Sequence, residues 1–215
     1  MTTGTKRTDP GVLVVAVTGG IASGKSSVCR MFERRGAKII DADAMGQRVI
    51  EEPEILPELV RTFGKRILSD EGKLDRKRLG GIVFSDRASL QSLNRIVHPI
   101  LIERICNEID GLVRSGFRGV IAVDAALIFE WNLIEIFDAI VVVSVREGIQ
   151  QARMRDRDSL GADEALSRIR CQIPQVEKIA RADFNIENDG SIEELEKSAA
   201  GVWGKLQQLL MAKGG

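Results

Sequence analysis

Short runs of β-branched residues recur along the chain without alternating with polar positions. The clearest run spans residues 11–18, and others lie within 119–124 and 138–145, while 37–40 and 184–187 are two further short candidate strands. A continuous apolar run is typical of a strand that is buried on both faces, as in a parallel sheet. The sequence therefore predicts a parallel sheet whose strands are separated along the chain by other elements.

Helical periodicity with charged faces fills much of the sequence between these strands. We expect a long helix to start near Asn94 with Pro99 in its first turn, and a charged helical segment to span 146–181. Ser191 and Glu194 have the spacing of a capping box, which predicts the start of a C-terminal helix. The alternation of strands with helices along the chain predicts an α/β fold, a three-layer doubly wound parallel sheet. In such a fold ligands bind at the carboxyl ends of the strands.

Composition and charge narrow the class of protein. A chain of 215 residues fits one core with helical insertions, and its 31 basic side chains balance its 31 acidic ones. With zero net charge and 4% aromatic residues, the chain lacks the basic field and the stacking surface that nucleic-acid-binding proteins use. No apolar run approaches the ~18 residues of a membrane span. We therefore expect neither a nucleic-acid nor a membrane partner.

The cysteine and histidine content bears on metals and on location. The three cysteines and the single histidine are widely spaced and form no Cys-x-x-Cys pair, so they lack the tight spacing of a structural zinc site. Free thiols and the absence of a secretion signal predict a protein of the reducing cytoplasm. Residues 1–10 are polar, and we expect them to form a disordered tail.

The segment after the first strand has the pattern Gly-x-x-x-x-Gly-Lys-Ser, from Gly19 to Ser26. A buried strand precedes it and a helical segment follows, which is the context in which this pattern binds phosphates. Its glycines let backbone N–H groups converge on one anion, and the helix N-terminus adds positive charge. We expect Lys25 to contact the β- and γ-phosphates of ATP and Ser26 to bind Mg²⁺. The other expected nucleotide contacts are Gly19, Gly20, Ile21, Ala22, Ser23, Gly24 and Ser27.

Other motifs separate the classes of phosphate-loop protein. The chain lacks the Asn-Lys-x-Asp motif of guanine-specific GTPases. Residues 158–161 match the Asp-x-x-Gly pattern of GTPases, but they follow an arginine-rich helix rather than a strand. A small kinase with a lid that closes over ATP fits better. The alternatives are another nucleoside, nucleotide or metabolite kinase, and a nucleotide-binding switch with slow turnover.

Several segments taken together resemble one family, the dephospho-coenzyme A kinases. Besides the phosphate loop these are Asp41-Ala-Asp43, Leu93–Pro99 with its Leu-Asn and His-Pro pairs, Gln151–Asp158, and Ala182–Gly190. The resemblance implies transfer of a phosphoryl group from Mg²⁺-bound ATP to the ribose 3′-hydroxyl of dephospho-coenzyme A, which gives coenzyme A and ADP. The expected partners are thus two small molecules, and the sequence does not indicate an oligomeric state.

The resemblance also implies a division of the chain into three parts. A phosphate-loop nucleotide-binding core is expected from residues 11–44, 117–149 and 182–212. A helical acceptor-binding region is expected at 45–116 and a helical lid at 150–181.

Three aspartates follow predicted strands. Asp43 matches the family's proposed general base, with an N-cap of the next helix as the alternative role. Asp41 is expected to support a Mg²⁺-bound water or the loop. Asp124 resembles the strand-end aspartate that holds Mg²⁺ through water, although many strands end in an aspartate.

Two arginines and an asparagine are candidate nucleotide ligands. Arg153 and Arg157 are four residues apart and therefore share a helix face, where the resemblance implies that they clamp the β- and γ-phosphates. Pairing with Asp156 and Asp158 is the alternative. Asn188 offers a donor and an acceptor to the adenine edge, with a plain turn as the alternative.

The remaining candidates concern the acceptor. Arg76 is a candidate contact for an acceptor phosphate, with a solvated face as the alternative. His98 is assigned to the structure of the acceptor region, as a cap or a packing residue rather than a base. Ala126 stands where the family usually has a proline, which is expected to loosen a loop without removing a chemical group. Cys29 is expected to pack as a small buried apolar residue.

Overall fold

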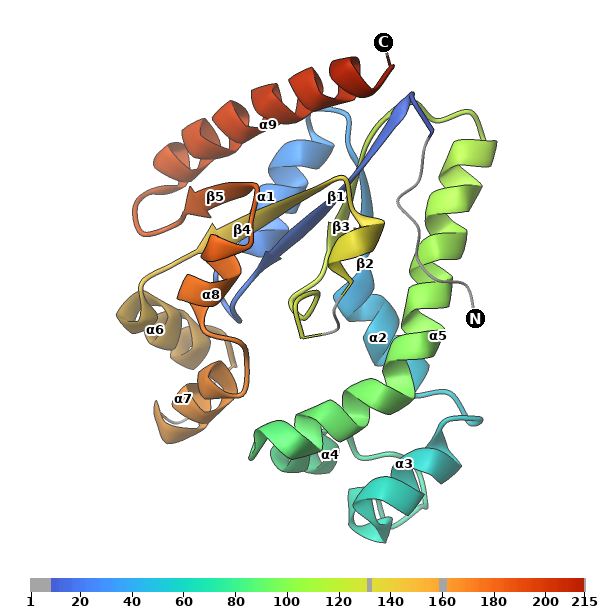
Figure 1. Ribbon diagram of the computed structural model, residues 1–215. Coiled ribbons are helices and arrows are strands. Elements are labelled where there is room, and N and C mark those ends of the chain that lie inside the picture. Colours follow the sequence, from blue (N-terminus) through green and yellow to red (C-terminus); the bar gives the residue numbers. More distant parts are fainter. Residues whose placement is uncertain (1–8, 131–132, 159–161, 215) are drawn as a thin grey trace.

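The computed structural model describes residues 9–130, 133–158 and 162–214, with side chains for all of these except 157, 158 and 162–165. Within these residues five parallel strands form one sheet in the order β2-β3-β1-β4-β5 (Figure 1). The strands are β1 (Val12–Gly19), β2 (Lys38–Asp41), β3 (Gly119–Asp124), β4 (Ala139–Ser144) and β5 (Phe184–Glu187). The predicted parallel sheet is thus confirmed, while the predicted tail lies outside the described residues except for Asp9 and Pro10.

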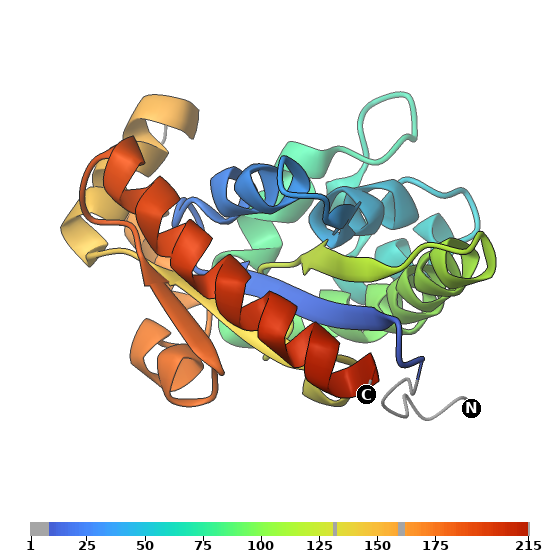
Figure 2. The same cartoon turned by 90° about the horizontal axis from the view of Figure 1, so that it is seen from above.

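Helices cover both faces of the sheet and extend beyond its carboxyl edge (Figures 1 and 2). Helices α1 (Lys25–Glu33) and α9 (Ile192–Gly214) lie on one face. Helices α2 (Ala42–Ile50) and α5 (Arg87–Arg114) pack on the other. The remaining helices are α3 (Leu56–Phe63), α4 (Arg76–Val83), α6 (Glu147–Asp158), α7 (Ala162–Arg170) and α8 (Gln175–Ala180), with short 3₁₀ turns at Lys65–Ile67 and Ile134–Ile136.

Alternate residues of β1 pack into the hydrophobic clusters on the two faces of the sheet. Leu13, Val15 and Val17 face α1 and α9, whereas Val14 and Ala16 face the layer that contains α2 and α5. All of them are at most 2% exposed. Burial on both faces explains why this strand has no polar alternation.

The capping box at the start of α9 is confirmed. The backbone N–H of Ser191 donates to the Glu194 carboxylate at 2.8 Å, and the Glu194 N–H donates to the Ser191 hydroxyl at 3.3 Å. The two bonds satisfy donors that the first helical turn leaves without partners.

The long helix α5 begins seven residues before its predicted start at Asn94, so that prediction was wrong. Asp86 is its N-cap and accepts a hydrogen bond from the Ser89 N–H at 2.8 Å. Pro99 therefore lies inside the helix, where it removes one backbone donor, and Figure 1 shows α5 changing direction partway along its length. No helix in the described part of the chain is long and apolar enough to cross a membrane.

Candidate active site

The phosphate loop, Gly19–Ser26, connects β1 to α1 at the carboxyl edge of the sheet. Gly24 has a φ of 98°, and a side chain there would collide with the amide of Asn188. Ala22 also adopts a left-handed backbone, with a φ of 57°. The loop is therefore curled tightly before α1, as an anion-binding loop requires.

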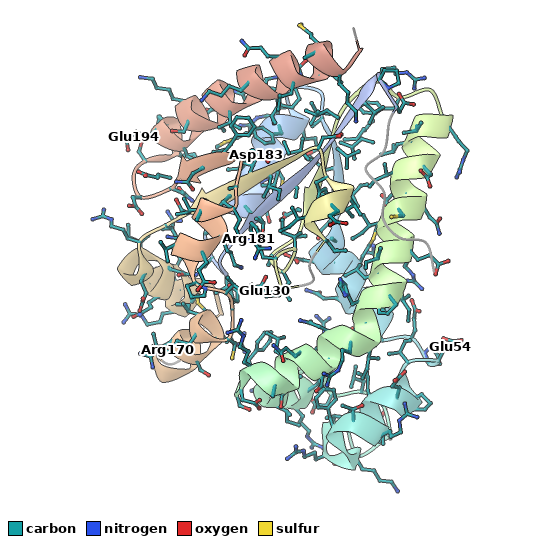
Figure 3. The ribbon with its side chains drawn as sticks, in the orientation of Figure 1. Glu54, Glu130, Arg170, Arg181, Asp183 and Glu194 are labelled. Atoms are coloured by element: carbon teal, nitrogen blue, oxygen red, sulfur yellow. The ribbon has the colours of Figure 1, made fainter. Side chains whose placement is uncertain are left out.

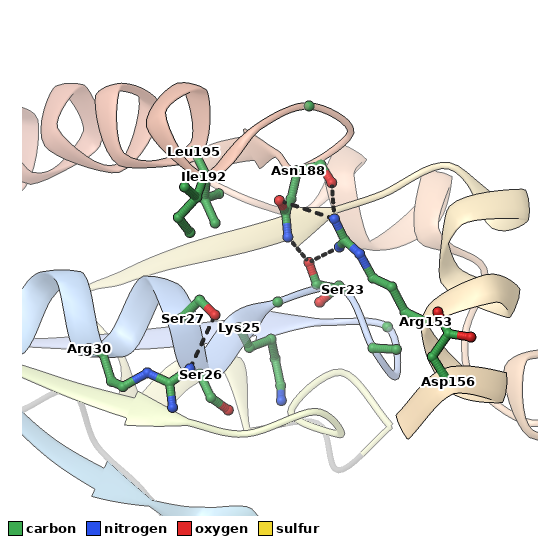
Figure 4. Close-up of a pocket in the computed structure, with 14 residues that line it drawn as sticks. Ser23, Lys25, Ser26, Ser27, Arg30, Arg153, Asp156, Asn188, Ile192 and Leu195 are labelled. Carbon is green, nitrogen blue, oxygen red and sulfur yellow. Dashed lines mark hydrogen bonds between the residues drawn. The ribbon is translucent and has the colours of Figure 1, made fainter. Parts of the chain in front are cut away.

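Side chains from later parts of the sequence brace this loop (Figure 4). The Ser23 carbonyl accepts hydrogen bonds from the Asn188 amide at 2.7 Å and the Arg153 guanidinium at 3.5 Å. The Ile21 N–H donates to the Gln172 side chain, and the Ile21 carbonyl accepts from Gln150. Sequence reasoning missed both glutamines, because glutamine in a polar segment carries no motif.

Lys25 lies between two carboxylates. Its Nζ is 3.1 Å from Asp43 Oδ2 and 3.1 Å from Asp124 Oδ1. Burial by itself lowers the pKa of Lys25, but the two carboxylates outweigh burial and hold the pKa above its ordinary value. The ammonium therefore stays charged at neutral pH, beside the loop that is expected to hold the phosphates.

Asp124 and Ser26 form the second part of this cluster. The Ser26 hydroxyl donates to Asp124 Oδ2 at 2.8 Å, while the buried Asp124 Oδ1 faces the Lys25 ammonium at 3.1 Å. A hydroxyl and a carboxylate are oxygen ligands of the kind that Mg²⁺ prefers. Across the described residues, no group of three carboxylate, histidine or cysteine side chains gathers into a metal site. A Mg²⁺ ion here would therefore share its coordination with the nucleotide, and the donors present fit that arrangement.

Asp43 lies in the first turn of α2 and bridges two loops. Its Oδ1 accepts from the Ala126 backbone N–H at 3.0 Å, while its Oδ2 faces Lys25. The N-cap role proposed as its alternative belongs to Asp41, which accepts from the Ala44 N–H at 2.8 Å. The Asp43 side chain is 36% exposed, so the carboxylate stays accessible from outside the cluster.

The backbone of Ala126 forms three hydrogen bonds near the active site that the sequence did not indicate. Its N–H bonds to Asp43, and its carbonyl accepts from Thr18 Oγ1 at 3.3 Å and Lys178 Nζ at 3.2 Å. Alanine thus removes no chemical group relative to proline, as expected, and it supplies a backbone N–H that proline lacks. Lys178 was not singled out either, since a lysine in a charged helical segment looks solvated, yet its side chain is 1% exposed and pairs with Glu130 at 2.9 Å.

A pocket of about 660 Å³ opens between the phosphate loop, α1, α6 and the start of α9 (Figure 4). Arg153 reaches it from α6, with its guanidinium 3.0 Å from the Asn188 carbonyl, and the described residues show no ion pair between Arg153 and Asp156. The backbone of Arg157 lies in α6, but its side chain lies outside the described residues. Asn188 is engaged with the loop itself, so its expected contact with adenine stays a prediction.

The acceptor candidates are more dispersed. Arg76 lies at the start of α4 and forms an exposed ion pair with Glu51 at 3.1 Å. His98 lies in the interior of α5 and is not a helix cap, and burial lowers its pKa. Cys29 is 3% exposed and packs in the core as expected.

A second cavity, of about 410 Å³, separates the start of α5 from α7. Ser167 Oγ donates to the Phe84 carbonyl at 2.9 Å, and the Arg168 guanidinium lies 5.2 Å from the Phe84 ring centre. Figure 3 shows Arg170 on the same helix. The segment that was expected to be a lid therefore contacts both the phosphate loop and the acceptor region.

Comparisons with known proteins agree on one family. The family model described as dephospho-CoA kinase matches residues 13–194. A dephospho-CoA kinase of Carboxydothermus hydrogenoformans is 41% identical over 181 residues, which cover 84% of this chain and 87% of the relative. A dephospho-CoA kinase of Thermobifida fusca is 40% identical over 204 residues, covering 94% of this chain and all of the relative.

A solved structure shares the fold of this chain along most of its length. A crystal structure of a Thermus thermophilus protein superposes with a TM-score of 0.73 at 31% identity. The superposition covers 90% of this chain and 97% of the other.

Proposed function

Because the chain belongs to the dephospho-CoA kinase family, we propose that it transfers the γ-phosphoryl group of ATP to the ribose 3′-hydroxyl of dephospho-coenzyme A. The observation that carries the proposal is the contact between Lys25 of the phosphate loop and Asp43 at 3.1 Å. It brings a carboxylate to the place where the terminal phosphate of a bound nucleotide is expected.

Phosphate binding is assigned to the loop and to the groups around the 660 Å³ pocket. Backbone N–H groups of the loop and the N-terminus of α1 attract the anionic phosphates. Lys25 neutralises the charge that builds up as the γ-phosphoryl group moves. Arg153, from the expected lid, lines this pocket, where its guanidinium can bind phosphate oxygens in a bidentate manner. We assign Arg157 the same role from the sequence.

Ser26 and Asp124 are the residues that would hold Mg²⁺. The ion, when bound, neutralises phosphate charge and orients the nucleotide. Because Ser26 donates to Asp124 in this structure, the hydroxyl already lies against the carboxylate that would complete the site.

Asp43 is assigned as the general base. A base has to accept the proton of the acceptor hydroxyl as that oxygen attacks phosphorus. The partly exposed carboxylate of Asp43, which lies beside Lys25, supports this assignment. We assign Arg76 and His98 to the acceptor region, at 45–116, which begins two residues after Asp43.

The division into core, acceptor region at 45–116 and lid at 150–181 is kept from the sequence. Helix α4 packs on α5, and α5 also packs on the sheet, so the acceptor region shares one hydrophobic cluster with the core. Cys29 and Cys171 are free thiols, in keeping with the cytoplasmic location proposed from the sequence.

The test is an ADP-release assay with dephospho-coenzyme A, AMP, adenosine and shikimate at equal concentrations. We expect turnover with dephospho-coenzyme A only, and mass spectrometry should identify the product as coenzyme A. The Lys25→Ala variant, purified in parallel, controls for contaminating kinases. Turnover with AMP and none with dephospho-coenzyme A would favour the other metabolite kinases and refute the proposal.

A further inference from the structure

The main chain of Ile21, in the phosphate loop, is bonded on both sides by glutamine side chains. Its N–H donates to Gln172 Oε1 at 3.1 Å, and its carbonyl accepts from Gln150 Nε2 at 2.6 Å. Gln150 lies in the first turn of α6, and Gln172 follows the end of α7. The segment that is expected to form the lid therefore contacts one loop residue from two separate places in the sequence.

We propose that Gln150 and Gln172 are positioning residues that hold the phosphate loop in its nucleotide-binding conformation. This inference rests on the proposed function, in which backbone N–H groups of the loop bind the phosphates of ATP. In the part of the chain that the structure describes, Ala22 is the one residue other than glycine with a left-handed backbone, at a φ of 57°. A residue with a Cβ adopts this conformation at a cost in free energy, so contacts on the neighbouring residue have to hold it there.

Gln172 is held in place by the residues on either side of it. The Cys171 thiol donates to the Phe84 carbonyl at 3.3 Å, and the Ile173 N–H donates to Glu130 Oε1 at 2.9 Å. Phe84 belongs to the acceptor region, and Glu130 belongs to the loop that follows β3. Because both neighbours are bonded to other parts of the protein, the Gln172 amide meets the loop from a fixed position.

Gln150 sets the position of α6 relative to the loop. The residue is 6% exposed, and it bonds the Ile21 carbonyl from the first turn of the helix. Arg153 lies one turn farther along α6, and its guanidinium reaches the Ser23 carbonyl at 3.5 Å. Loss of the Gln150 bond should therefore loosen the loop and also shift the guanidinium that lines the nucleotide pocket.

The two glutamines use opposite ends of their amides, which allows a charge-matched test. Gln172 accepts through its oxygen, whereas Gln150 donates through its nitrogen. An ionised glutamate has acceptors but no donor. Gln172→Glu therefore keeps an acceptor for the Ile21 N–H, while Gln150→Glu places a carboxylate against the Ile21 carbonyl. Both variants add one negative charge beside the same residue, so their comparison cancels the general effect of that charge on anion binding.

Isothermal titration with ATP and Mg²⁺, in the absence of acceptor, measures the effect on nucleotide binding. We expect Gln150→Met and Gln172→Met each to weaken ATP binding by about 3- to 10-fold, the effect of losing one hydrogen bond. Gln172→Glu should bind ATP at least about fivefold more tightly than Gln150→Glu. The matched control is Gln151→Met, since this glutamine is the next residue of α6 but bonds the exposed Glu147 at 2.9 Å. Its loss should change the ATP affinity by less than about twofold.

Steady-state kinetics separate this role from a general loss of stability. The KM for ATP should rise with the Kd of each variant, whereas the KM for dephospho-coenzyme A should stay within about threefold of the wild type. The contact is also measured without nucleotide. In ¹⁵N-labelled protein the Ile21 amide proton should shift upfield in Gln172→Met, which removes the acceptor. If a methionine variant fails to fold by circular dichroism, Gln150→Asn or Gln172→Asn, whose shorter side chain falls short of the loop, takes its place.

Three results would overturn the inference. They are ATP affinities within about twofold of the wild type for both methionine variants, equal ATP affinities for the two glutamate variants, and KM values that rise equally for ATP and the acceptor. Wild-type protein that binds ATP but does not phosphorylate dephospho-coenzyme A would instead refute the proposed function, and the ATP titrations would still decide whether the two glutamines position the loop.

Discussion

Lys178 and Glu130 form a buried ion pair between α8 and the loop that follows β3. Their side chains are 1% and 9% exposed, and Lys178 Nζ lies 2.9 Å from Glu130 Oε1 (Figure 3 marks Glu130). The same oxygen accepts the Ile173 N–H at 2.9 Å, whereas Glu130 Oε2 is buried without a hydrogen-bond donor. Burial lowers the pKa of Lys178 against the opposing effect of Glu130, so the lysine depends on this carboxylate to stay charged.

The perturbation is Lys178→Met, which keeps most of the side-chain volume and removes the charge. Glu130 is then buried without its cation, and breaking a buried pair in this way costs about 3–5 kcal/mol. For a protein of this size 1 kcal/mol corresponds to about 2–4 °C in Tm, so the midpoint should fall by roughly 6–20 °C. Thermal unfolding at pH 7, followed by circular dichroism, measures the change.

Two further variants distinguish the loss of stability caused by breaking this buried ion pair from the effect of removing any charged side chain. Arg34→Met breaks an exposed ion pair with Glu196, 2.9 Å long with side chains 62% and 48% exposed, and should cost less than about 1 kcal/mol. Lys178→Met combined with Glu130→Leu should regain most of the lost stability, because no charge is left buried. A Lys178→Met protein that melts within about 2 °C of the wild type would refute the reasoning.

Three predictions concern catalysis. Lys25→Ala should abolish phosphoryl transfer, whereas ATP binding should weaken less because the backbone N–H groups of the loop remain. The ADP-release assay measures the turnover, and isothermal titration measures the ATP affinity. Near-normal turnover would contradict the prediction. Asp43→Asn should lower kcat by about 10²–10⁴-fold with little change in acceptor affinity, and a loss below about threefold would mean that Asp43 is not the base. Replacing Arg153 and Arg157 together by alanine should lower kcat far more than it weakens adenine binding. Residues 150–181 should gain protection from hydrogen exchange when a non-hydrolysable ATP analogue binds, and high protection that does not change on binding would show a rigid helical segment instead of a lid.

The parts of the site that follow from local pattern were predictable. An apolar run, a glycine-rich turn and a helix are neighbours in the sequence, so the phosphate loop and its context could be inferred together. The start of α5 could not be predicted in this way. Pro99 resembled a first-turn proline, whereas the N-cap of the helix is Asp86, farther upstream. The Lys178–Glu130 pair was hidden for another reason: the burial of a lysine depends on tertiary packing, and nothing in its own segment reports that packing.

The assignment of the two neighbouring aspartates shows how little separates a structural role from a chemical one. Both lie at the end of the same apolar strand, and from the sequence the N-cap was an alternative role for Asp43 alone. Asp41 ends β2 with an extended backbone, φ −85° and ψ 90°, which is the conformation of an N-cap, so its carboxylate turns back to the Ala44 N–H. Asp43 lies in the first turn of the helix, past the N-cap position, and its carboxylate contacts Lys25 and Ala126. The residue at which the strand ends thus decides which of the two carboxylates is available for chemistry.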